Sequence, residues 1–139
     1  RRRGAAIRIE KGRTTMETKK AKVLKIPARG RWNFVEVATG EDGIVPLETL
    51  QGAVGGWIEC WWLGDVGFPG LDLFLNEEGK LKRLSFNVVA TRLSGILARG
   101  DCIVGDAIVC AHDESSSSSV GLTEKDELNL RRRLSELGF

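Results

Sequence analysis

Residues able to carry out covalent chemistry are few and widely spaced in this chain of 139 residues. His112 is the single histidine, and the three cysteines form no CxxC pair and no familiar metal-ligand spacing: Cys60, Cys102 and Cys110. A general base acting near neutral pH would have to be His112 or a carboxylate such as Glu59 or Asp106. No basic group is evidently placed to activate a thiol. The sequence therefore predicts a protein that is not an enzyme, that holds no metal or cofactor, and whose thiols are reduced and mostly buried.

Three of the four tryptophans lie in WIECWWL, residues 57–63, directly after a pair of glycines. The stretch is predicted to be a strand, so alternate side chains point to opposite faces. Ile58, Cys60 and Trp62 form a uniformly apolar row that is predicted to face the core. The other row mixes one charge with two indoles and is predicted to be covered by a helix or partly wet: Trp57, Glu59, Trp61 and Leu63.

Half-buried packing and stacking on a ligand both remain open for the indoles of the second row. Its candidate ligand or partner contacts are Trp57, Glu59 and Trp61. No Lys or Arg occurs between Arg31 and Lys80, which argues against a platform for nucleic-acid bases.

Positive charge is concentrated at the start of the chain. Residues 1–25 contain ten Lys or Arg against two Glu, a net charge of +8, whereas the remaining residues carry eleven basic and seventeen acidic side chains, a net charge of −6. Residues 1–20 are predicted to form a basic, flexible arm, and Met16 opens the alternative that natural translation starts there. Such an arm can bind phosphate backbones. The candidate nucleic-acid contacts are Arg1, Arg2, Arg3, Lys19, Lys20 and the run Arg131, Arg132 and Arg133.

The length suits one domain, and the 42% apolar and 29% charged fractions are ordinary for a soluble globular protein. No apolar run approaches the roughly 20 residues that span a bilayer, and no secretory signal is recognisable. A soluble, cytoplasmic protein without membrane contact is therefore expected.

The elements that would position these residues follow from pattern and capping. Strands are predicted at 21–28 and 32–38 as a hairpin, at 57–63, at 71–75, and at 101–111 with a break at Gly105-Asp106. NEEGKL, from residue 76, is predicted to turn a hairpin that returns into Leu81 and Leu84. A short helix is predicted after Pro46, ended by Gly55 and Gly56, and another within 86–98.

The end of the chain is predicted to be a helix that begins at Thr123 and stops at Gly138. Leu130, Leu134 and Leu137 form its apolar stripe, and Arg131 to Arg133 suit its C-terminal end as a solvated face. The serine stretch before it, within 112–121, is predicted to be a flexible loop. The fold prediction is a single α+β domain over 21–139, with a mostly antiparallel sheet of four to five strands and two to three short helices.

Several short blocks, in this order, resemble the family known as domain of unknown function 3846: LETLQGAVGGWIE, LFLNEEGKLKRL, FNVVATRL, IVGDAIV and GLTEKD. The resemblance covers roughly residues 21–137. It implies a compact α+β domain of phages, plasmids and bacterial genomes, and hence a bacterial host cell, and it implies no activity. Many members have an arginine where this chain has Val88, so no role of that arginine carries over.

Among the matched positions, Asn87 and Thr91 lie four residues apart and would share one face of a helix. Either they cap and pack that helix, or they contact a ligand or partner. Two hypotheses of function follow. The first is an uncharacterised, non-enzymatic binding or accessory module of phage or mobile-element type that acts on an unknown protein or small ligand. The alternative is a nucleic-acid-binding accessory protein that uses the basic arm and the arginine run. The oligomeric state is not predicted.

Overall fold

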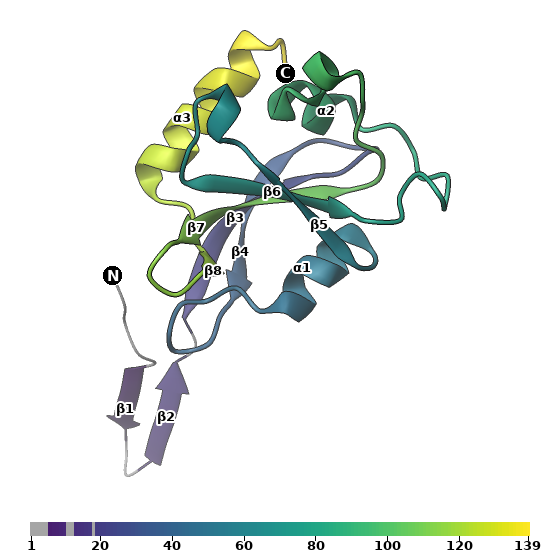
Figure 1. Cartoon of the computed structure of the whole chain (residues 1–139). Helices are drawn as coiled ribbons and strands as arrows, with labels where there is room; N and C mark the ends of the chain where they lie inside the picture. Colours follow the sequence, from purple (N-terminus) through teal and green to yellow (C-terminus); the bar gives the residue numbers. More distant parts are fainter. Residues whose placement is uncertain (1–5, 11–12, 18) are drawn as a thin grey trace.

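The computed structural model describes residues 6–10, 13–17 and 19–139. Its centre is an antiparallel sheet in which five strands follow the spatial order β4-β3-β7-β6-β5 and a sixth, β8, pairs with β7. The strands are β3 (Lys20–Ile26), β4 (Asn33–Ala38), β5 (Ile58–Trp62), β6 (Leu71–Asn76), β7 (Ala107–Asp113) and β8 (Ser118–Val120). The predicted α+β class and antiparallel sheet are confirmed (Figure 1).

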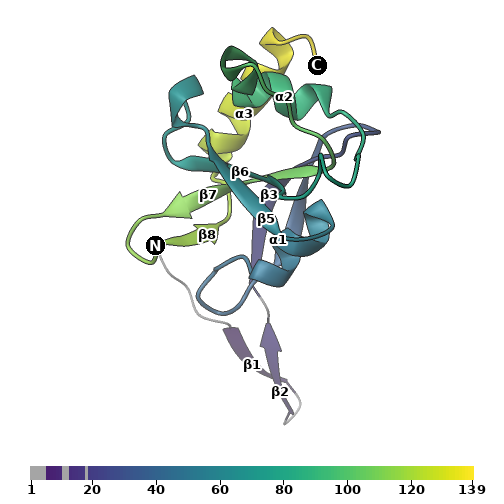
Figure 2. The ribbon, with the colours of Figure 1, turned by 45° about the vertical axis from the view of Figure 1, so that its right-hand side comes forward.

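Helices cover both faces of the sheet. Figures 1 and 2 show α2 (Val88–Ser94) and α3 (Glu124–Glu136) on one face and α1 (Leu47–Val54) on the other. Alternation along the strands serves both layers: on β3, Leu24 and Ile26 belong to the core beneath α2 and α3, whereas Ala21 and Val23 belong to the core beneath α1. Two short 3-10 helices, η1 (Gly64–Val66) and η2 (Ile96–Arg99), lie in the connections.

Local signals form the helix ends as predicted. Gly55 ends α1 in the left-handed conformation, with φ of 82°, and its N–H bonds the carbonyl of Gln51. Thr123 begins α3 with a capping box: its side chain accepts from the N–H of Asp126, whose carboxylate accepts from the N–H of Thr123. Leu130 and Leu134 of α3 are completely buried.

The prediction of a second hairpin at NEEGKL is wrong. Residues 77–83 form consecutive turns instead of a loop and a returning strand. The Asn76 side chain accepts from the N–H of Glu78 at 2.8 Å, the N–H of Lys82 donates to the carbonyl of Glu78, and Arg83 has a φ of +56°. Leu81 is 81% exposed, so it takes no part in the core.

Two further elements differ in extent from the prediction. The strand expected at 101–111 begins only at Ala107, because Gly105 adopts a φ of +81° and Asp106 accepts from the N–H of Ala28. The loop expected over 112–121 instead contains the end of β7 and all of β8, joined by a turn that the Asp113 carboxylate caps through the Ser115 N–H. β8 raises the strand number of this sheet to six.

The basic start of the chain contains β1 (Ala6–Glu10) and β2 (Arg13–Glu17), which form a separate two-stranded antiparallel ladder. Arg1, Arg2 and Arg3 lie outside the described residues. The flexibility expected of residues 1–20 stays a prediction.

Candidate functional site

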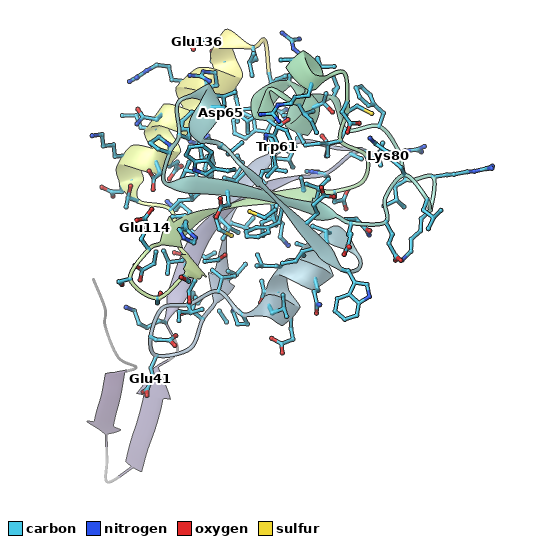
Figure 3. All side chains as sticks on the ribbon, viewed as in Figure 1. Glu41, Trp61, Asp65, Lys80, Glu114 and Glu136 are labelled. Carbon is cyan, nitrogen blue, oxygen red and sulfur yellow. The ribbon has the colours of Figure 1, made fainter. Side chains whose placement is uncertain are left out.

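Strand β5 places Glu59 and Trp61 on the face of the sheet that α2 covers. The Trp61 ring packs against the larger core and is half-buried, and its Nε1 donates to the carbonyl of Ser94 at 2.9 Å. The Arg99 guanidinium lies 5.6 Å from the centre of the ring. Figure 3 shows Trp61 on the α2 side of the sheet. Of the two interpretations left open by the sequence, half-buried packing describes Trp61.

Trp57 lies just before the first residue of β5 and is 64% exposed. Its carbonyl accepts from the N–H of Glu77, which holds the backbone against the turn after β6. Glu59, two residues further on, is also exposed. The row predicted to be partly solvent-exposed is therefore exposed at Trp57 and Glu59 and covered at Trp61 and Leu63.

The prediction that Ile58, Cys60 and Trp62 all face the core is wrong for two of them. Ile58 packs against the core beneath α1, but Cys60 is exposed and Trp62 is 53% exposed. The reason is the position of α1: the helix ends at Val54, whose carbonyl accepts from Asn76, the residue opposite Ile58. The helix therefore covers the start of β5 and leaves the rest of the row open.

The Trp62 ring folds back over the loop that follows β5. Its Nε1 donates to the carbonyl of Pro69 at 2.8 Å. Gly64 makes room for the ring, because a Cβ at this position would lie 1.9 Å from a ring carbon. The Trp62 indole is thus partly exposed, and these contacts fix its position.

The outer edge of β5 presents main-chain groups that bond to no other strand among the described residues. Pairs 57–77 and 63–71 across β5 and β6 are hydrogen-bonded, through Glu77 N–H and Leu63 N–H. Such pairs alternate along an antiparallel ladder, so Glu59 and Trp61 also bond to β6. The N–H and C=O groups of Ile58, Cys60 and Trp62 therefore point away from the sheet.

A cluster of titratable side chains lies on the same face as Cys60. His112 Nδ1 is 3.4 Å from the carboxylate of Asp72. Asp72 belongs to β6, the strand between β5 and β7. Desolvation, then the Asp72 carboxylate, raises the pKa of Cys60 to about 12, although the residue as a whole is exposed. Burial, then Asp72, raises the pKa of Cys110 to about 12 as well. Thiolates are thus disfavoured at both positions, which is the opposite of what a nucleophilic cysteine needs.

Asn87 and Thr91 lie in the interior. Asn87 is 1% exposed and caps α2: its Oδ1 accepts from the N–H of Ala90, and its Nδ2 donates to the carbonyls of Ile26 and Gly105. The hydroxyl of Thr91, fully buried, accepts from the N–H of Ile103 at 2.8 Å and donates to the carbonyl of the same residue. Both side chains join α2 to the segment before β7, Asn87 also joins it to β3, and neither is accessible from the surface.

Two arginines of the 131–133 run are held by contacts within the domain. Arg131 pairs with Glu127 at 2.8 Å and lies 4.6 Å from the centre of the Phe34 ring. Arg133 donates to the carbonyl of Val66 at 2.6 Å and stacks on Phe68. Arg132 is exposed.

Lys19 and Lys20 line a surface hollow of about 890 Å³ at the start of β3. Lys22, His112, the turn between β7 and β8, and residues 42–44 and 120–123 also line it. Lys22 pairs with Glu127 at 2.7 Å, and this bond raises the pKa of the lysine. The lining of the hollow thus combines three lysines of one segment with the carboxylates of Asp42 and Asp113, which come from distant parts of the sequence.

The open edge of β5 and this hollow were both missed by sequence reasoning. The apolar row and the tryptophans of β5 are visible in the sequence, but their exposure and the position of β5 at an edge depend on strand order, which a local pattern does not predict. Within residues 6–10, 13–17 and 19–139, no group of His, Cys, Asp and Glu is arranged to hold a metal ion. No helix in the described part of the chain is long and apolar enough to cross a membrane.

The family model described as Domain of unknown function (DUF3846) matches residues 21–135. No curated protein and no solved structure is significantly similar to the chain.

Proposed function

The chain belongs to the DUF3846 family, and from this premise we propose that it is a non-enzymatic binding module whose contact surface is the open edge of β5. The observation that carries the proposal is the coincidence of exposed indoles with outward-pointing main-chain groups. Trp62 and the N–H and C=O groups of Ile58, Cys60 and Trp62 lie along one edge, and Trp57 stands at its end.

A protein that binds such an edge adds an extended segment to the sheet. Main-chain hydrogen bonds then supply affinity, and pockets or rings for alternate side chains supply specificity. Natural edge strands are commonly shielded by charge, by proline or by a covering element. Glu59 is the single charged residue on β5, and α1 covers only the start of the strand. The remaining edge is accessible to a partner.

The chemistry of the site supports binding over catalysis. The raised pKa values of Cys60 and Cys110 disfavour a nucleophilic thiolate. The family resemblance implies an accessory protein of phages or other mobile elements, in the cytoplasm of a bacterial host, and a partner-binding edge is compatible with that role.

The test is partner capture with a variant that alters the edge alone. Cys60→Pro removes an N–H that points away from β6, so the β5–β6 ladder keeps its bonds. Cys60→Ser is the matched control, because it also removes the thiol and keeps the N–H. Both variants and the original chain are immobilised and exposed to an extract of the cells that carry the gene. Capture by the original chain and Cys60→Ser, and not by Cys60→Pro, is expected. Equal capture by all three would refute the proposal.

A second candidate function is nucleic-acid binding at the hollow. The observation that favours it is that Lys20 and Lys22 line this hollow together with His112. Electrophoretic mobility shifts of short DNA and RNA, measured at rising salt, test it with Lys20→Glu and with Arg132→Glu as a comparison on α3. Binding that weakens in Lys20→Glu and falls with salt supports the candidate. Absence of any shift at low salt excludes it.

A further inference from the structure

The uncovered part of β5 is self-complementary, and this identifies one partner that fits it. The inference rests on the proposed function and names the occupant of the same edge. An incoming antiparallel strand forms hydrogen-bonded pairs with the three residues whose main-chain groups point outward, Ile58, Cys60 and Trp62. These are also the residues whose side chains form the apolar row that α1 leaves partly open.

We propose that the partner is a second copy of this chain, paired antiparallel through β5 about a two-fold axis at Cys60. In this register Ile58 faces Trp62 of the second copy, Cys60 faces Cys60 of the second copy, and Trp62 faces Ile58 of the second copy. In this register, all three outward residues of each chain gain a hydrogen-bonded partner. A register shifted toward either end leaves at least one of these residues without a partner within β5 of the second copy. The exposed Trp62 ring is placed beside an apolar side chain.

Charges on the opposite face of the strand match in the same register. Glu59 stands directly opposite Trp61 of the second copy in a non-hydrogen-bonded pair, where Cα atoms approach to about 4.5 Å. In each chain, Arg99 lies 5.6 Å from the centre of the Trp61 ring. The Glu59 carboxylate is thereby brought to the guanidinium of Arg99 of the second copy. Arg99 is available to it, because its bond to Asp65 spans 3.6 Å between two largely exposed side chains. Because of the two-fold axis, the contact occurs twice in the dimer.

The other edge of the sheet does not offer the same surface. Along β4 no large apolar side chain is among the exposed ones of the described chain, and Phe34 is covered by Arg131 at 4.6 Å. Pairing β5 with β4 of another copy would also join unlike edges and propagate without closing. Pairing of β5 with β5 closes after two chains and continues the sheet from six strands to twelve across the dimer.

Sedimentation equilibrium of the full chain tests the proposal, at concentrations from about 1 to 500 µM because a dimer dissociates on dilution. The variants are Glu59→Arg, Arg99→Glu and the double exchange Glu59→Arg with Arg99→Glu, with Glu48→Arg on α1 as the control charge change. Each single variant places like charges opposite each other, so its dimer Kd should rise by about ten-fold or more. The double exchange should return to within about three-fold of the original, and Glu48→Arg should not differ from it.

Circular dichroism and thermal unfolding confirm that each variant is folded, and Cys60→Pro supplies a second variant that abolishes the dimer by a different route. A dimer whose Kd is unaffected by Glu59→Arg, Arg99→Glu and Cys60→Pro uses another surface and overturns the proposal. A chain that stays monomeric throughout also overturns it. In that case, capture of a host protein that depends on the Cys60 N–H leaves the proposed function standing, and absence of such capture removes both.

Discussion

Replacement of Asn87 should destabilise the fold rather than weaken binding, because all three of its side-chain hydrogen bonds are internal. Loss of an N-cap costs about 1 kcal/mol. Removal of Nδ2 leaves the carbonyls of Ile26 and Gly105 without this donor in a buried site, at about 1 kcal/mol each. Asn87→Ala is therefore expected to lower the free energy of unfolding by about 3 kcal/mol, and the Tm by roughly 10 °C for a chain of this size.

Two further substitutions separate these contributions. Asn87→Ser keeps an acceptor for the cap and loses both Nδ2 bonds, so about 2 kcal/mol of the loss should remain. Asn87→Asp keeps the cap but points a carboxylate oxygen at two carbonyl oxygens, and should cost at least as much as alanine. Asn33→Ala, at an exposed position of β4, serves as the control.

Urea unfolding followed by tryptophan fluorescence measures these differences, provided that the slope of the transition is the same in all variants. The reasoning fails if Asn87→Ala costs less than about 1 kcal/mol, or if Asn87→Ser matches Asn87→Ala, because the cap and the Nδ2 bonds would then not be separable contributions.

Three further outcomes are expected. Thr123→Ala should lower the free energy of unfolding by about 1 kcal/mol, and Thr123→Ser should restore most of it, as measured by urea unfolding, since the hydroxyl is one half of the capping box. The pKa of Glu127 is lowered in the folded chain, chiefly by its hydrogen bond from Lys22. The ionised Glu127 therefore contributes fully to stability above the ordinary glutamate pKa, and this contribution is lost as the pH falls through the lower folded value. Glu127→Gln should flatten the pH dependence of the Tm on this acidic side. At pH 7.5, Cys60 should react with iodoacetamide at least about ten-fold more slowly than free cysteine, because only the thiolate is reactive and the pKa of Cys60 is raised. Asp72→Asn should speed the reaction, since Asp72 contributes to the raised pKa. Mass spectrometry follows the reaction.

The elements that the sequence predicts well are those whose signals are local. The capping residues and the spacing of leucines in α3 act within a few residues, and the structure places Leu130 and Leu134 in the core as expected. The same holds for α1, where Pro46 and Gly55 mark the two ends. Asn87 is an intermediate case: its capping role was one of two interpretations, and its bonds to Ile26 and Gly105 depend on segments that are distant in sequence.

The elements that it predicts poorly depend on which edges of the sheet are vacant. NEEGKL carries good turn residues, but β6 already pairs with β5 on one side and β7 on the other, so a strand returning through Leu81 and Leu84 has no edge to join. The serine stretch meets the reverse situation. β3 pairs with only the first residues of β7, and β8 takes up the side of β7 that β3 leaves vacant.

Strand β5 shows how far periodicity reaches and where it stops. Alternation assigns Ile58, Cys60 and Trp62 to one face correctly, but whether that face is covered depends on where α1 ends. In an antiparallel strand, residues whose side chains share a face also direct their main-chain groups to the same edge. The apolar row that α1 leaves open is therefore the row that any strand added to β5 must bond. Glu59, the one charge on the strand, then falls in a close, non-hydrogen-bonded pair, where a cation on the added strand stabilises the pairing. A partner that carries Arg99 over Trp61 supplies this cation, and a second copy of the chain is such a partner.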